Sequence, residues 1–132
     1  MKDCKCEDYA PTVLRIFLGL LFLAPGLMKL MNPDSIIGML GGMGFPLAAL
    51  FGWIVIISEV LGGLALILGY KVKWAVWPLV IVLLVATITV AIPGLSAPMG
   101  AIGLLWHILG IAGLISVFLS GAGALSLEKK LA

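Results

Sequence analysis

The sequence predicts an all-α integral membrane protein, a four-helix bundle whose spans run up, down, up and down. Of its 132 residues, 63% are hydrophobic and only 11% are charged, and the mean hydropathy is +1.28. Soluble domains average about 25% charged residues. Four apolar runs are each long enough for the roughly 20 residues that a membrane helix needs. We therefore expect one domain over residues 1–132, with spans at about residues 10–31, 46–70, 74–92 and 99–120.

The first span follows a polar segment of mixed charge. Its apolar run exceeds the roughly 7–15 residues of a signal-peptide core, so we interpret it as a membrane helix. Pro25 lacks the N–H that would bond the carbonyl of Leu21, and we expect a kink there. Cys4 and Cys6 precede the span as a C-x-C pair with no nearby histidine. We interpret them as reduced thiols, with a soft-metal or thiol site as the alternative.

Residues 32–45 interrupt the pattern of long apolar runs. They begin with the turn signal NPD, contain four glycines and hold too few apolar residues to span a bilayer. We predict a short helix or loop in the membrane interface, or a re-entrant lid over the bundle. Short turns at residues 71–73 and 93–98 separate the later spans. The last twelve residues, GAGALSLEKKLA, are expected to include a short surface helix.

Four spans place both termini on one side, and short turns make consecutive spans antiparallel neighbours. Six lysines fall on the side of the termini, namely Lys2, Lys5, Lys71, Lys73, Lys129 and Lys130. The positive-inside rule then predicts a multi-pass protein of the cell membrane with cytoplasmic N- and C-termini. Because the chain has no basic run, we exclude nucleic acid as a partner and expect the lipid bilayer to surround it.

The stretch Trp53–Gly69 carries a carboxylate, Glu59, in the middle of an apolar run. A carboxylate at such a depth must be neutral, be paired or face a polar cavity, because an exposed charge there is costly. Three groups are candidates to meet it: Arg15, Lys29 and His107. Glu59 is thus the centre of the predicted site.

One face of the first span carries two of these candidates. Arg15, Gly19, Phe22, Gly26 and Lys29 recur at spacings of four, three, four and three, which places them on one helix face. The two glycines on this face allow close approach of a neighbouring helix in the membrane. We expect this face to pack against the span that carries the carboxylate.

Depth along the spans, at about 1.5 Å per residue, suggests how the polar groups meet. Arg15 lies a few residues inside the membrane, on the side that carries the termini, and Glu59 lies nearer mid-membrane. The depth of His107 is between those of Glu59 and Lys29. We predict an Arg15–Glu59 ion pair within one polar track through the bundle. The structural alternative is a buried pair that only fixes helix register, with both cations reaching toward the headgroups and the histidine bonded to a backbone carbonyl.

Three segments resemble the DoxX family of small four-span membrane proteins: RIFLGLLFLAPGLMKL (Arg15–Leu30), SEVLGGLALILG (Ser58–Gly69) and GAGALSLEKKL (Gly121–Leu131). The resemblance implies the four-span fold. Relatives include DoxD-type subunits of thiosulfate:quinone oxidoreductase, and some members are associated with redox complexes that handle oxidative and thiol stress. The family's polar positions carry over to Arg15, Lys29 and Glu59, with His107 a weaker match. This chain departs from a thiol relay because it has no intramembrane cysteine.

The resemblance implies an oxidoreductase, or a subunit of one, linked to quinone and a small sulfur-type donor. Glu59 and His107 are then the catalytic candidates for proton handling, and Arg15, Lys29 and Glu59 the candidates for substrate binding. We predict no metal site, and a single histidine cannot supply bis-histidine haem ligation within one chain. The cofactor is then a quinone, and further electron carriers belong to a redox partner subunit.

Two alternatives remain open from the sequence. One is a binding or transport protein for a small apolar molecule or lipid, with the ion pair as the polar anchor of an apolar pocket. Four spans are few for a complete transporter, so that role predicts a homodimer. The other is a membrane scaffold or assembly factor, in which the polar pair is structural.

Overall fold

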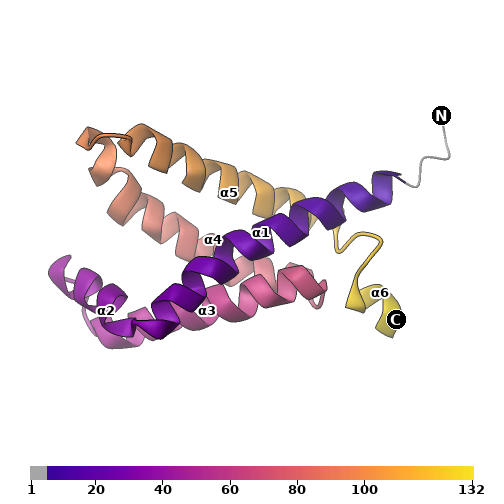
Figure 1. Cartoon of the computed structure of the whole chain (residues 1–132), viewed down its shortest axis with the longest axis horizontal. Coiled ribbons are helices and arrows are strands. Elements are labelled where there is room, and N and C mark those ends of the chain that lie inside the picture. Colours follow the sequence, from indigo (N-terminus) through magenta and orange to yellow (C-terminus); the bar gives the residue numbers. More distant parts are fainter. Residues whose placement is uncertain (1–5) are drawn as a thin grey trace.

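The computed structural model describes residues 6–132, and this part of the chain is helical with no strand (Figure 1). The α-helices are α1 (Cys6–Met31), α2 (Pro33–Gly42), α3 (Ala48–Leu68), α4 (Val72–Ala86), α5 (Gly100–Ser120) and α6 (Leu127–Leu131). A π-helical segment, η1 (Thr87–Ala91), extends α4, and a 3₁₀ turn, η2 (Pro93–Ser96), follows. The predicted four spans are confirmed, since α1, α3, α4 with η1, and α5 are long and apolar enough to cross a membrane. Cys4 lies outside the described residues, and Cys6 is a free, exposed thiol.

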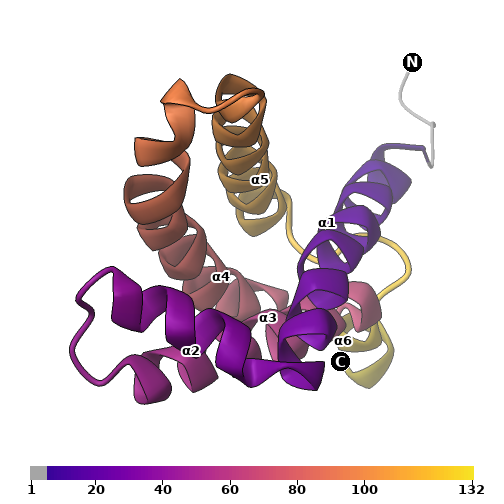
Figure 2. The same cartoon turned by 60° about the vertical axis from the view of Figure 1, so that its left-hand side comes forward.

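Helices α1 and α3 cross at close range, and glycines make this possible (Figure 2). A Cβ atom added at Gly63 would lie 2.8 Å from the carbonyl oxygen of Gly19, and one added at Gly19 would lie 2.7 Å from the carbonyl oxygen of Gly63. Small residues of this kind are what membrane helices use to bring their backbones together. The face predicted on the first span does pack against α3.

Two apolar clusters hold the bundle together. The larger joins α1, α3, α4 and α5 toward the end that carries the termini, and its buried members include Phe22, Leu66, Leu79 and Leu114. The smaller joins α2 to the first half of α3 through Ile36, Leu40 and Ile56. The interrupting segment is therefore a short helix packed on α3, one of the forms predicted for it.

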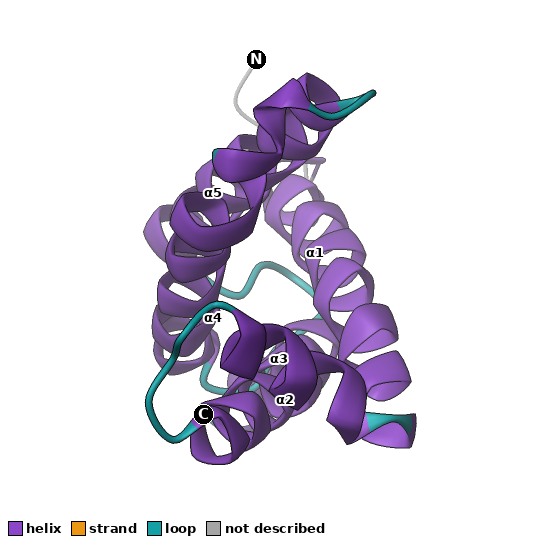
Figure 3. Cartoon of the chain, turned by 90° about the vertical axis from the view of Figure 1, so that its left-hand side faces the viewer, coloured by secondary structure: helices purple, strands orange, loops and turns teal. Residues whose placement is uncertain are grey.

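The end with the termini is closed by the C-terminal segment. The amide of Ala124 donates to the carbonyl of Asp8 at 2.9 Å, and the amide of Glu128 donates to the carbonyl of Gly69 at 3.1 Å. Ser126 caps α6 by accepting a hydrogen bond from the amide of Lys129 at 3.2 Å, so the predicted C-terminal helix forms. At the opposite end, α4 and α5 diverge from α2 and α3, as the view from that end shows (Figure 3).

Candidate functional site

Arg15 is fully buried, but its partners differ from those predicted. Its guanidinium donates to the carbonyls of Leu66 at 2.7 Å and Ile67 at 3.1 Å, and to the carbonyl of Leu125. Leu66 and Ile67 belong to the last turn of α3, where carbonyls lack partners within the helix. Arg15 therefore binds the end of α3 to the segment that precedes α6.

The predicted Arg15–Glu59 pair is wrong, and helix geometry gives the reason. Arg15 lies level with Leu66, which is seven residues beyond Glu59 on α3. At about 1.5 Å per residue that separation is about 10 Å, too far for the guanidinium while it bonds the end of α3. The predicted role of Arg15 in substrate binding stays a prediction, and its position points instead to a structural role.

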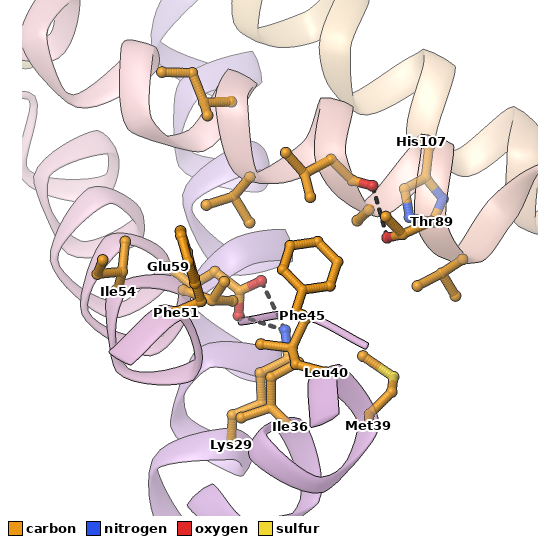
Figure 4. Close-up of a pocket in the computed structure, with 16 residues that line it drawn as sticks. Lys29, Ile36, Met39, Leu40, Phe45, Phe51, Ile54, Glu59, Thr89 and His107 are labelled. Carbon is orange, nitrogen blue, oxygen red and sulfur yellow. Dashed lines mark hydrogen bonds and ion pairs between the residues drawn. The ribbon is translucent and has the colours of Figure 1, made fainter. Parts of the chain in front are cut away.

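Glu59 instead pairs with Lys29. The Lys29 Nζ atom lies 2.7 Å from Oε1 and 2.6 Å from Oε2 of Glu59 (Figure 4). Gly26, one turn before Lys29, packs directly on the carboxylate residue, since a Cβ there would lie 2.9 Å from the Cβ of Glu59. Glu59 is near the middle of the 21-residue helix α3, so the ion pair lies deep within the span.

The pair is unequally exposed. The side chain of Glu59 is 8% exposed and that of Lys29 is 28% exposed. An ammonium group has three N–H donors, and Glu59 accepts two of them in this geometry. The lysine therefore keeps a donor and some open surface for a bound molecule, while the carboxylate holds it in place.

The exposed side of the pair faces a cavity of about 360 Å³ between α2 and α3 on one side and α4 with η1 on the other (Figure 4). Ligand pockets range from about 300 to 1,000 Å³. Its polar side chains are few: Lys29, Glu59, Thr89 and His107. The apolar lining includes Ile36, Met39, Leu40, Phe45, Phe51, Ile54, Ile81, Val82, Val85 and Val90. The cavity is thus an apolar chamber with the Lys29–Glu59 pair on one wall and Thr89 and His107 on another (Figure 4).

A second cavity of about 360 Å³ reaches the same polar group from the side of α1 and α5. Its lining adds Leu21, Pro25 and Trp106, and it shares Lys29, Glu59 and His107 with the first cavity. The three polar side chains therefore stand between two apolar spaces. Of the four groups predicted to converge, Lys29 and Glu59 meet directly, His107 lines the same two cavities from another wall, and Arg15 lies apart (Figure 4).

His107 has one ring nitrogen engaged. Its Nδ1 lies 2.7 Å from the carbonyl oxygen of Gly103, one turn earlier on α5. Because a carbonyl only accepts, Nδ1 must donate, which leaves Nε2 as an acceptor in the neutral ring and a donor in the charged ring. The predicted bond to a backbone carbonyl is confirmed, and it orients the ring at both cavities.

The sequence interpretation missed two parts of the site. Thr89 lies in the π-helical segment η1, and its hydroxyl donates to the carbonyl of Val85 at 2.7 Å. Single π turns in membrane and soluble helices are frequent at functional sites, because they change the direction in which side chains project. The segment after the first span was expected as a lid, but the side chains by which α2 and Phe45 line the pocket were not identified. The signal that could have indicated η1 is the pair Thr87 and Thr89 at the end of an aliphatic run that begins at Leu79.

Comparison with known proteins agrees with the fold. The pattern of the DoxX family matches residues 10–92, which include most of α1, all of α2 to α4 and both members of the ion pair. An uncharacterized membrane protein of Mycobacterium tuberculosis is 30% identical over 129 residues, which cover 89% of this chain and 78% of that protein. No solved structure matches the chain.

Proposed function

The chain belongs to the DoxX family of membrane proteins, and from this premise we propose that it is a quinone-binding oxidoreductase subunit linked to a small, sulfur-type electron donor. The observation that carries the proposal is the apolar cavity that ends at Lys29, Glu59 and His107. Intramembrane ionisable side chains commonly mark functional sites. The family relationship alone names no ligand, so the argument rests on the chemistry of the cavity.

A quinone matches this chemistry in both of its parts. Its ring carries two carbonyl oxygens, which accept hydrogen bonds, and its tail is apolar. Lys29, and His107 in its charged form, supply donors to the cavity, while aliphatic and aromatic side chains line the rest. Phe45 and Phe51 meet edge to face with ring centroids 6.0 Å apart and offer aromatic surface to a ring.

Reduction of a quinone to a quinol takes up two electrons and two protons. In this proposal the electrons come from the sulfur donor, directly or through a redox partner subunit. Glu59 and His107 handle these protons: the Lys29–Glu59 pair gives one from the Lys29 ammonium, the charged form of His107 gives the other from Nε2, and both groups are reprotonated from water, as positioned acids are in general acid catalysis. Arg15 has no part in the chemistry, because its guanidinium is engaged with the carbonyls at the end of α3.

One alternative has an observation in its favour. The two apolar cavities around the polar group also suit a protein that binds or transports a lipid-like molecule without turnover. Quinone binding together with donor-dependent quinol formation supports the redox role. Retention of a lipid-like molecule, with no quinone binding, supports the alternative.

Tryptophan fluorescence tests quinone binding directly, because quinones quench indole emission and Trp106 lines the second cavity. We expect a decyl-substituted benzoquinone to quench the purified protein saturably, with one site per chain. The Trp106→Phe variant should lose most of that quenching. Trp77→Phe is the matched control, because Trp77 packs on Phe118 away from both cavities and should leave the quenching intact. Quenching that never saturates, or that both variants reduce equally, would contradict the proposal.

We further propose that both termini lie in the cytoplasm, from the lysines on that side of the spans. Both cysteines of the chain precede or begin the first helix, and Cys6 is exposed. A membrane-impermeant maleimide should therefore leave the protein unmodified in intact cells and modify it after permeabilisation. The control is a Cys4→Ser, Cys6→Ser variant that carries Met43→Cys, since Met43 is exposed at the opposite end of the bundle. The maleimide should modify this variant already in intact cells. Labelling of wild type from outside would place the termini on the opposite side.

A further inference from the structure

A third hollow lies on the outer surface of the bundle, separate from the two cavities around Glu59. It is a groove of about 360 Å³ between α3 and α4, near the turn that joins them. Tyr70, Lys71 and Trp74 line the end of the groove nearest this turn, which is called its upper end below. Small residues of α3, among them Ser58 and Ala65, line its length.

The dimensions of the groove match one leaflet of a bilayer. Its wall on α3 runs from Ile57 to Ala65, eight residues apart, which is about 12 Å at the rise of an α-helix. The turn with Tyr70 and Lys71 continues it toward the membrane surface. Half of the hydrocarbon core is about 15 Å thick, so the groove spans the depth of one acyl chain.

The upper end of the groove is positively charged. The Nζ atom of Lys71 lies 5.6 Å from the centroid of the Tyr70 ring, so the ammonium group and the phenol sit together at this end. Lys73 follows on the exposed side of α4. The bond from the Glu128 amide to Gly69 brings the start of α6 beside the same turn, but this helix carries Glu128 as well as Lys129 and Lys130, so the positive charge of the groove is assigned to Lys71 and not to α6. None of the described residues that line the groove is acidic.

We propose that this groove binds one anionic phospholipid, with an acyl chain along α3 and the phosphate at Lys71 and the Tyr70 hydroxyl. Lysines near a membrane surface attract anionic lipid at about 1 kcal/mol each, and a zwitterionic headgroup gains less because its own cation opposes them. A second copy of the chain is a poorer occupant. A two-fold interface here would bring the Lys71 side chains of both copies together within the membrane surface.

Native mass spectrometry tests the proposal with the full chain. The protein is reconstituted in vesicles of equal parts phosphatidylglycerol and phosphatidylcholine and is then extracted gently. We expect one phosphatidylglycerol per chain to be retained in preference to phosphatidylcholine. Lys71→Gln should lower that retention about fivefold. Ala65→Phe, which fills the groove, should abolish it.

Matched controls separate the groove from a general attraction of charge. Leu64→Phe adds the same ring to an exposed position of α3 outside the groove, and Lys130→Gln removes the same charge from α6. Both should retain the lipid nearly as wild type does. Equal retention of the two lipids, or equal effects of Lys71→Gln and Lys130→Gln, would overturn the proposal. A dimer that Ala65→Phe dissociates would also overturn it and assign the groove to a second copy.

Discussion

Replacement of Glu59 by Gln is expected to weaken quinone binding about 10- to 100-fold and to leave the protein inserted. The change removes the carboxylate that holds the Lys29 ammonium by both oxygens. A quinone that loses its charge-assisted hydrogen bond to a mispositioned Lys29 loses about 1.5–3 kcal/mol of binding free energy, which is of that order of magnitude. The free energy of unfolding should also fall by about 1–3 kcal/mol. This loss is smaller than that expected for a fully buried ion pair, because Lys29 is 28% exposed and can turn toward the cavity. Fluorescence titration with the decyl benzoquinone and thermal unfolding measure the two effects.

A double variant separates the functional role of the pair from its structural role. Lys29→Met with Glu59→Met replaces both charges by apolar groups, which often restores stability when a buried pair is removed as a whole. We expect near wild-type unfolding and no recovery of quinone binding. Asp34→Asn is the control, since it removes an exposed carboxylate elsewhere on the chain. Full quinone affinity in the double variant would show that the pair serves only to fix the helices.

Replacement of Arg15 by Met is expected to have the largest effect on stability, about 3–5 kcal/mol. The guanidinium donates to the carbonyls of Leu66, Ile67 and Leu125. The Leu66 carbonyl would keep the Gly69 amide as a donor, but the apolar side chain would remove the Arg15 donors from the other two carbonyls and fill a fully buried site with an unbranched chain that cannot replace them. The segment that carries α6 should detach, so trypsin should cleave faster at Lys129 and Lys130. Thermal unfolding in detergent and limited proteolysis measure both results.

Arg15 is predicted to act on stability and not on the ligand. The fraction of Arg15→Met that remains folded should bind quinone as wild type does, because Arg15 lies outside the residues that line the two cavities. Lys73→Met, which removes an exposed positive charge at the same end, should change neither property. Wild-type stability combined with lost quinone binding would restore the role in substrate binding that the sequence predicted for Arg15.

The sequence was sufficient for the four spans, because long apolar runs separated by turns leave few other structures in a membrane. It also placed Glu59 at the centre of the site and Lys29 on the face that meets it. It chose the wrong partner for the carboxylate because spacing along α1 cannot fix the vertical register of α1 against α3. That register is set by the contact of Gly19 with Gly63, which aligns Arg15 with the end of α3.

An apolar pocket with a polar anchor was among the alternatives that the sequence left open, but the walls of the cavity could not be predicted from it. Its walls come from α2, whose packing on α3 depends on Ile36 and Leu40, and from the π-helical segment η1. Neither element has a strong local signal, since both depend on how neighbouring helices pack. The bond between His107 and the Gly103 carbonyl was foreseen as a structural option, but the position of the ring on the cavity wall across from the ion pair was visible only in three dimensions.

Photolabelling with an azido-substituted quinone tests the central claim most directly. After irradiation of the native protein in membranes, peptide mass spectrometry locates the attached residue. We expect the label on residues that line the cavity, in α2, in η1 or in the part of α5 near His107. Excess unlabelled quinone should prevent this labelling. Labelling confined to the outer faces of the helices, unchanged by excess quinone, would contradict the assignment of this cavity as the quinone site.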